Sequence, residues 1–544
     1  MKSLYVAVIV AATFTACSSV KNLAVPTMDT TVSLTAAKEG AVTDEQFNHW
    51  AHADLETDTI PGLSLEKAYK FLEGKTGETV IVGVIDSGID IEHEDLKDVL
   101  WINSKEIAGN EIDDDKNGYV DDIYGWNFLG GNGVAAPEQL EITRLVAKMK
   151  PRFEGKTIET VSEEEKSDFE LYQKYLKSFN NAAEKNLKTK ARLNQIADNF
   201  RAIEQFLGKE NFTAGDLKNV KTDDLMLQSQ IGDILGLASR GLDKKAFTEY
   251  YENFKKNKNY DLNFDGRAIV GDNPQLFSDT KYGNGFVIGS KEEESHGTHV
   301  SGIILASRTN NIGMKGVAHN AKLMSIRAVP DGDERDKDVA LAIRYAVDNG
   351  AKVINMSFGK SYSPYRHWVF EAIKYAENND VLLVHAAGND HKDIDVKDNW
   401  PNDSVDKNSE IADNVLTVGA MSINYREDLP ASFSNYGQKN VDVFAPGVQI
   451  YSTVPQDKYA RYNGTSMASP EVAGVATLVR SYYPQLSASQ VKHIIMNSGT
   501  KIDMDVLVPG KEGEKAAFST LSVSGSVANA YNALVLADKM VNKK

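Results

Sequence analysis

The feature that most constrains the fold is a repeated alternation of short apolar runs with longer amphipathic stretches. Between the apolar runs, residues 336–349 and 368–378 repeat apolar side chains at three- and four-residue intervals, which is the helical period. A strand–helix–strand order of this kind predicts an α/β fold, a mostly parallel sheet with helices on both faces. Six runs have the length and the Val and Ile content of buried strands: 79–85, 323–329, 352–357, 381–385, 415–419 and 441–445.

One long block, from about residue 134 to residue 260, interrupts this rhythm. It is highly charged and helical in pattern, as in FELYQKYLKSF at 169–179 and IADNFRAIEQFL at 196–207, and no convincing strand occurs in it. We therefore expect a large helical insertion in the main domain. A solvated helical cap is the simplest interpretation of its charge pattern.

The chain opens MKSLYVAVIVAATFTAC, in which Lys2 precedes an apolar run that ends in small residues before Cys17. This pattern predicts a signal peptide over residues 1–16 and an exported protein. The stretch Phe14–Cys17 resembles the lipobox of bacterial lipoproteins, which implies a lipid on the Cys17 thiol and a membrane-anchored protein facing the periplasm or the cell surface. Phe14 stands where Leu is usual, so an ordinary signal peptide and a periplasmic or secreted protein is the alternative.

The residues after Cys17 are polar and weakly patterned as far as residue 60, which predicts a tether over 17–60 and a main domain over 61–544. Cys17 is the only cysteine, so the domain cannot contain an internal disulfide. The net charge of −17 disfavours nucleic acid and anionic membrane surfaces as partners, because phosphate groups need Lys and Arg to neutralise them. Membrane contact is therefore expected only through a lipid at Cys17.

Three separated motifs supply the groups that acyl transfer to a serine requires: a hydroxyl, a base, and an acceptor that orients the base. VIVGVIDSGID places Asp86 at the end of a buried run, SHGTHVSGIILA places His296 at the start of a helix, and NGTSMASP places Ser466 at the start of another. Each motif alone has a simpler explanation as a turn or a helix cap. Their joint occurrence in the order Asp, His, Ser favours catalysis.

These motifs resemble the three signatures of the subtilisin-like serine peptidases, the subtilases. The resemblance covers about 80–128 and about 291–533, and implies that Ser466 is the nucleophile, His296 the general base and then acid, and Asp86 its orienting partner. LLVHAAGND resembles the family's oxyanion segment, which assigns the amide of Asn389 to the oxyanion beside the main-chain N–H of Ser466. The family's peptide-pairing cleft segments correspond here to Ser357, Phe358, Gly359, Ala386, Ala387 and Gly388.

A metal centre at the histidines is the competing interpretation of HGTH. A zincin would need H-E-x-x-H, which neither this motif nor HEDL at 93–96 supplies. His299 is therefore expected to be a packed helix residue beside the base.

Two acidic loops flank the insertion, DDDKNGYVDD at 113–122 and DLNFDGRAIVGD at 261–272. Their acids and amides follow the spacing of calcium-binding loops, with Gly118 and Gly266 at the sixth position, although the first loop lacks the closing Glu. We predict structural calcium, with an acidic solvated turn as the alternative. The candidate ligands are Asp113, Asp115, Asn117, Asp121 and Asp122 in the first loop and Asp261, Asn263, Asp265 and Asp272 in the second.

Two functions are compatible with these features. The first is an exported serine endopeptidase that acts on proteins or peptides through an acyl-enzyme on Ser466. The second is a lipid-anchored binding protein that has kept the fold and lost catalysis. Retention of Asp86, His296, Asn389 and Ser466 together favours the first.

Overall fold

The computed structural model describes residues 23–31, 42–239 and 243–542, and these form two compact units. The first unit contains the chain up to Ala136, residues 267–330, and the chain from Glu334 onward. The second contains residues 137–266 and 331–333. The helical insertion predicted over 134–260 corresponds to this second unit.

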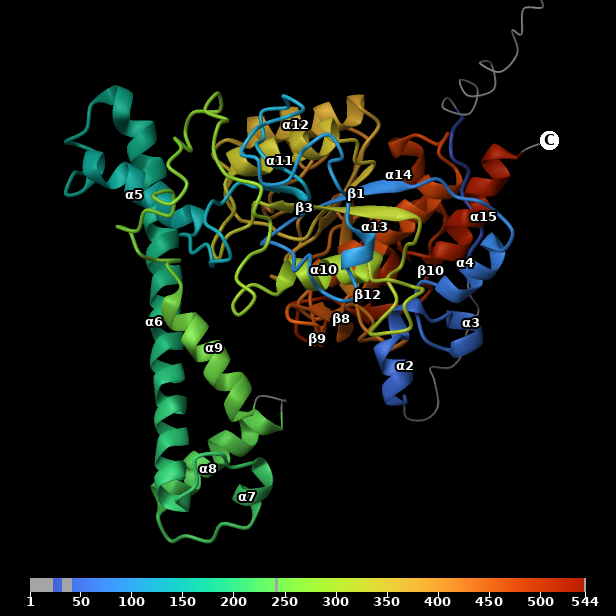
Figure 1. The fold of residues 1–544 in the computed structure, drawn as a ribbon. Helices are drawn as coiled ribbons and strands as arrows, with labels where there is room; N and C mark the ends of the chain where they lie inside the picture. The colour runs from blue at the N-terminus through green and yellow to red at the C-terminus, as the bar shows by residue number, and fades with distance from the viewer. Residues whose placement is uncertain (1–22, 32–41, 240–242, 543–544) are drawn as a thin grey trace, which may run out of the picture. The chain divides into compact units, whose positions relative to one another are not determined.

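A nine-stranded sheet forms the centre of the first unit, in the order β10-β13-β7-β6-β5-β4-β1-β3-β2 (Figure 1). All neighbouring strands from β2 to β13 are parallel, and only β10 runs antiparallel to β13. The prediction of a mostly parallel sheet is confirmed. The strands are β1 Val80–Asp86, β2 Gly125–Asn127, β3 Ala321–Arg327, β4 Val353–Met356, β5 Leu382–Ala386, β6 Val415–Met421, β7 Val443–Pro446, β10 Thr500–Lys501 and β13 Ser526–Val527.

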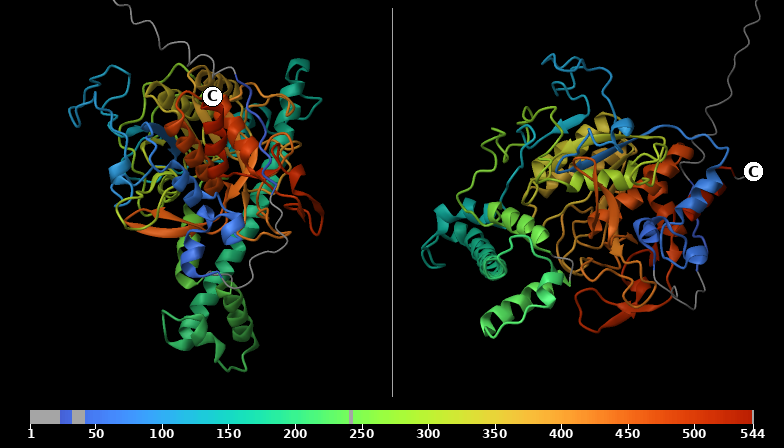
Figure 2. Two further views of the ribbon diagram at one scale, coloured as in Figure 1. Left: turned by 90° about the vertical axis from the view of Figure 1, so that its right-hand side faces the viewer. Right: turned by 60° about the horizontal axis from the view of Figure 1, so that its bottom comes forward.

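Helices cover both faces of this sheet, as the views in Figures 1 and 2 show. On β1, Val82 and Val84 belong to one apolar cluster, whereas Ile85 belongs to another on the opposite face, because successive strand side chains alternate. The first cluster is built with α10 His296–Leu305, α13 Thr465–Tyr482, α14 Ala488–Ser498, α15 Ala530–Val541 and α4 Leu65–Leu72. The second is built with α11 Asp336–Asp348 and α12 Arg366–Asn378.

Two hairpins complete the first unit: β8 Ile450–Val454 with β9 Lys458–Tyr462, and β11 Asp505–Leu507 with β12 Lys515–Ala517. The second unit is helical, with its own apolar cluster formed by the C-terminal part of α6 and the helices that follow it. Its helices are α5 Glu141–Phe153, α6 Lys166–Leu207, α7 Ala214–Lys218, α8 Leu225–Ala238 and α9 Lys244–Lys256.

The tether predicted over 17–60 is wrong for its described part. Residues 44–58 form two short helices, α2 Asp44–Asn48 and α3 Leu55–Asp58, with Trp50 1% exposed between them. The main chain of Met28 donates to the carbonyl of Asn497 at the end of α14 (3.0 Å). A few buried apolar side chains in a polar stretch were enough to fold it onto the domain. The predicted signal peptide (1–16) and Cys17 lie outside the described residues.

Candidate active site

The carboxylate of Asp86 and the imidazole of His296 meet at the carboxyl edge of the sheet. Asp86 ends β1 and is 1% exposed, and its Oδ1 lies 2.8 Å from Nδ1 of His296, the first residue of α10. The same oxygen accepts from the main-chain N–H of Ser87 (2.8 Å), and Oδ2 has no hydrogen-bond partner among the described residues. This contact fixes the ring orientation and places the proton on Nδ1, so that Nε2 is left to act as a base.

Two opposing effects act on the pKa of His296. Removal of the ring from water lowers the pKa, whereas the charge of Asp86 and its hydrogen bond raise it, and the net pKa lies above the ordinary value of 6.5. The protonated imidazole is therefore stabilised, which suits a group that must accept a proton during a reaction.

Ser466 is the second residue of α13, where main-chain N–H groups are free of helical partners. Its hydroxyl donates to the main-chain oxygen of Ser357 (3.1 Å), and the hydroxyl of Ser357 donates to the main-chain oxygen of Ser466 (3.0 Å). In this structure the nucleophile candidate is thus bonded to the predicted cleft rather than to His296. The hydroxyl of Ser295, the residue before His296, lies 2.7 Å from that of Tyr462, four residues before Ser466.

The amide of Asn389 is oriented by Thr465. Its Oδ1 accepts from the main-chain N–H and from the hydroxyl of Thr465, both at 2.9 Å, so the NH₂ group faces the other way. A methyl group added to Gly464 would lie 3.5 Å from both Nδ2 of Asn389 and the main-chain N of Ser466. Both nitrogens therefore lie near the same point beside the main chain of Gly464.

The predicted cleft segments follow two adjacent parallel strands, β4 and β5. Ser357 and Phe358 are nearly buried, and the carbonyl of Phe358 accepts from Nε2 of His385 (2.8 Å), which ties one segment to the neighbouring strand. Gly388 has a φ of +100°, and a Cβ there would lie 2.5 Å from the amide of Asn435. Glycine is required at this position because any side chain would collide with that amide.

His299 packs beside the base, as predicted. Its Nε2 lies 3.1 Å from the carbonyls of Ile450 and Ala460, and its ring stacks on Tyr462 at 4.3 Å between centroids. Burial lowers the pKa of His299 to about 3, so the ring is neutral and serves as an N–H donor to the β8–β9 hairpin.

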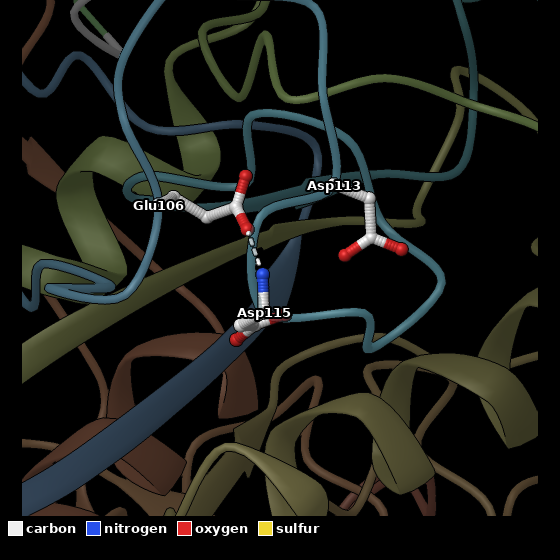
Figure 3. A group of neighbouring side chains, drawn as sticks. All are labelled: Glu106, Asp113 and Asp115. Atoms are coloured by element: carbon white, nitrogen blue, oxygen red, sulfur yellow. Dashed lines mark hydrogen bonds between the residues drawn. The ribbon is translucent and has the colours of Figure 1, made fainter.

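The first acidic loop gathers only part of its predicted ligand set. Carboxylate oxygens of Asp113 and Asp115 lie within 4.8 Å of one another and of Glu106, which Figure 3 shows turned toward the same space. Asp121 instead accepts from the main-chain N–H groups of Gly109 and Glu111. The remaining two candidates bond each other: Asn117 donates to the buried Asp122 (3.1 Å), which also accepts from the hydroxyl of Tyr345 (2.6 Å).

Glu106 was missed because it precedes the calcium-like spacing. Its two oxygens accept from the main-chain N–H groups of Asp115 (3.0 Å) and Asp121 (3.1 Å). No residue pattern within 113–122 indicates this contribution, which arises from the way the chain folds back on itself.

The second loop gives Asp272 a different role from the predicted one. Oδ1 of Asp272 pairs with Arg267 and Oδ2 with Lys337 (2.6 Å), and the carboxylate is fully buried. Two side-chain cations already neutralise it, so it does not serve as a closing calcium ligand. Asp261 accepts from the N–H of Asn263 (3.1 Å) in a local turn; Asp265 lies in the same loop.

The first unit is thus a mostly parallel α/β domain in which an Asp–His pair, a serine and an oriented asparagine amide lie at the carboxyl edge of the sheet. Residues 77–518 match the subtilase family model. The chain belongs to the subtilase family.

Individual relatives align over part of the chain. It is 42% identical over 34% of its length to the thermophilic serine proteinase of Bacillus sp. strain AK1, of which it spans 43%. It is 36% identical over 40% of its length to subtilisin DY of Bacillus licheniformis, of which it spans 77%. A solved cold-adapted subtilisin-like serine proteinase is 28% identical, with 43% of this chain and 76% of that chain covered and a TM-score of 0.34.

Proposed function

We propose that this chain is an exported serine endopeptidase that hydrolyses protein or peptide substrates through an acyl-enzyme on Ser466. The observation that carries the proposal is the 2.8 Å contact between buried Asp86 and His296, at the same sheet edge as the oriented amide of Asn389. A binding protein without catalysis has no physical need for a buried carboxylate held against an imidazole.

The reaction begins when the Ser466 hydroxyl rotates from the carbonyl of Ser357 to Nε2 of His296. Its oxygen attacks the scissile carbonyl carbon while His296 takes the proton, and Asp86 stabilises the imidazolium. The carbonyl oxygen becomes an oxyanion between Nδ2 of Asn389 and the N–H of Ser466. His296 then protonates the departing amine, and water hydrolyses the ester by the same steps in reverse.

The test is labelling with a fluorophosphonate probe together with digestion of a peptide library. Wild type should label on Ser466 and cleave peptides, and Ser466→Ala should do neither. Ser481→Ala is the matched control, because Ser481 lies on the same helix and its hydroxyl is bonded to the carbonyl of Glu78 (2.7 Å). Folded wild type that neither labels nor cleaves would support the binding-protein alternative.

Calcium is the cofactor that the first acidic loop best fits. Glu106, Asp113 and Asp115 offer hard carboxylate oxygens that converge within 4.8 Å, and the repulsion between them favours a divalent cation. When bound, the ion would stabilise the loop structurally. The other candidates of this loop, Asn117, Asp121 and Asp122, remain predictions from the sequence.

Export and anchoring rest on the sequence and on the relatives. One relative, 33% identical over 41% of the chain, is a cell wall-associated protease of Bacillus subtilis. Within the part of the chain that the structure describes, every helix is too short or too polar to cross a bilayer. From the lipobox-like stretch that ends at Cys17, we propose that any membrane attachment is through a lipid on its thiol. Radiolabelled palmitate should enter wild type and not Cys17→Ser; equal incorporation in both would contradict the anchor.

A further inference from the structure

Arg327 is a buried cation at the carboxyl edge of the sheet, on the strand next to β1, which carries Asp86. It ends β3, and its register partners are Asp86 on β1 and Asn127 on β2. Its side chain is 0% exposed. A charge that is fully removed from water needs several hydrogen-bond partners, because the free-energy cost of its desolvation would otherwise destabilise the fold.

The guanidinium bonds three carbonyls in two separate loops, the one after β1 and the one after β2. Nε donates to the carbonyl of Ser87 (2.8 Å), the residue after Asp86. Nη1 donates to the carbonyl of Gly130 (3.1 Å), and Nη2 to the carbonyl of Val134 (2.7 Å). The planar, five-donor shape of arginine suits this role, which a lysine could not fill.

The charge of Arg327 is balanced by Glu294, two residues before His296. Nη2 lies 3.0 and 2.9 Å from the two oxygens of Glu294, whose side chain is 7% exposed. The same carboxylate accepts from the main-chain N–H groups of Ser290 (2.7 Å) and Ala136 (3.1 Å). The pair therefore joins the turn before His296 to the loop after Asp86.

We propose that Arg327 and Glu294 are positioning residues that hold Asp86 and His296 in register, and that the pairing of their opposite charges leaves the protonation of His296 under the control of Asp86. The inference rests on the proposed function. Neither residue touches the reacting atoms; each acts through the main chain on either side of the catalytic pair.

The two charge-changing variants should shift the pKa of His296 in opposite directions, which a purely structural role would not produce. Glu294→Gln leaves the cation of Arg327 unbalanced and disfavours protonated His296, so the pKa of His296 falls. Arg327→Met leaves the negative charge of Glu294 unbalanced, so the pKa of His296 rises. The titratable groups that interact with His296 are Asp86 on β1 and His299 on α10, and Lys291, five residues before it, is already paired with Asp90 at 2.7 Å.

The experiment measures the rate of fluorophosphonate labelling against pH, and kcat and KM for a peptide substrate, in Glu294→Gln, Arg327→Met and Arg327→Lys. We expect the acidic limb to move by about half a pH unit in opposite directions for Glu294→Gln and Arg327→Met. In all three, kcat should fall at least ten-fold, with KM within about two-fold of wild type.

Asp338→Asn is the matched control. It removes one buried carboxylate charge from an arginine, since Asp338 pairs with Arg267 (2.7 Å) and its side chain is 1% exposed, and it has no contact with the described site. It should lower thermal stability and leave the acidic limb in place. If Arg327→Met does not fold, Glu294→Gln and Arg327→Lys decide the question.

The proposal would be overturned if the acidic limb of the pH–rate profile did not move in Glu294→Gln and Arg327→Met, or moved in the same direction in both. So would losses of kcat that match those of Asp338→Asn. Wild type that fails to label at any pH would instead overturn the proposed function, so the two failures are distinguishable.

Discussion

Thr465 holds the side-chain oxygen of Asn389 with two hydrogen bonds of 2.9 Å, one from its main-chain N–H and one from its hydroxyl. The same hydroxyl accepts from the main-chain N–H of Gly388 (3.0 Å). The residue beside the nucleophile thereby decides which way the amide points.

Thr465→Val should lower kcat, because it keeps the side-chain shape and removes one of the bonds that orient Asn389. The loss of about 1 kcal/mol corresponds to roughly five- to ten-fold. Asn389→Ala should lower kcat by about 10²–10³-fold, a magnitude established for subtilisin rather than derived from this structure. Steady-state kinetics of the double variant should equal those of Asn389→Ala alone; fully multiplicative losses would show that Thr465 acts elsewhere.

The pH dependence of activity should reflect the raised pKa of His296. The base must be neutral to accept the serine proton, so kcat/KM should decline as pH falls through a value above 6.5. Asp86→Asn removes the charge that raises the pKa, so the surviving activity should have its acidic limb at lower pH and be about 10⁴-fold weaker. Labelling rates across pH measure both, and an unmoved limb would contradict the role of Asp86.

Chelation should destabilise the protein through the Glu106, Asp113 and Asp115 group. A site saturated at about 100 times its Kd contributes about 2.7 kcal/mol, which corresponds to a fall of about 3 °C in the Tm of a unit of this size. Asp113→Asn should lower Tm in calcium and abolish the effect of chelator, whereas the control Asp261→Asn in the second loop should retain it. Scanning calorimetry with and without chelator is the measurement; an unchanged wild-type Tm would argue against the ion.

Asp272 should contribute to stability without a bound calcium ion. Asp272→Ala leaves the buried cations Arg267 and Lys337 without their shared partner, which should lower the free energy of unfolding by about 3–5 kcal/mol. Urea titrations in calcium and in chelator should give the same difference between wild type and variant. A difference that disappears in chelator would restore Asp272 as a calcium ligand.

Trp50→Ala should destabilise the first unit. The indole is buried, and its N–H donates to the carbonyl of Val448 (3.1 Å), one residue from Gly447, whose carbonyl accepts from Gly464. Loss of a buried Trp costs about 3–5 kcal/mol. Urea unfolding should show this loss; an unfolding midpoint like that of wild type would mean that residues 42–60 contribute nothing to the fold.

The longer strands were predictable because their signals are local, whereas the Asp86–His296 contact joins residues 210 apart and was implied by the resemblance of three motifs to the subtilases. The run at 79–85 is apolar on both faces, as a central parallel strand must be, and Asp86 follows it directly. β2, β10 and β13 have three residues or fewer, too few for any periodicity. Asp272 and Trp50 have partners 65 and 398 residues away, Lys337 and Val448, which residue spacing does not reveal. Glu106 has nearby partners but lies outside the calcium-like spacing.

The reciprocal bonding of Ser357 and Ser466 has a consequence for the resting molecule. The carbonyl that holds the nucleophile belongs to the segment on which an incoming polypeptide is expected to dock. An amide of that polypeptide would compete for the same carbonyl, and once displaced the hydroxyl would be free to turn toward its base. Substrate binding would then activate the Ser466 hydroxyl, and the hydroxyl would be comparatively unreactive when no polypeptide occupies the cleft.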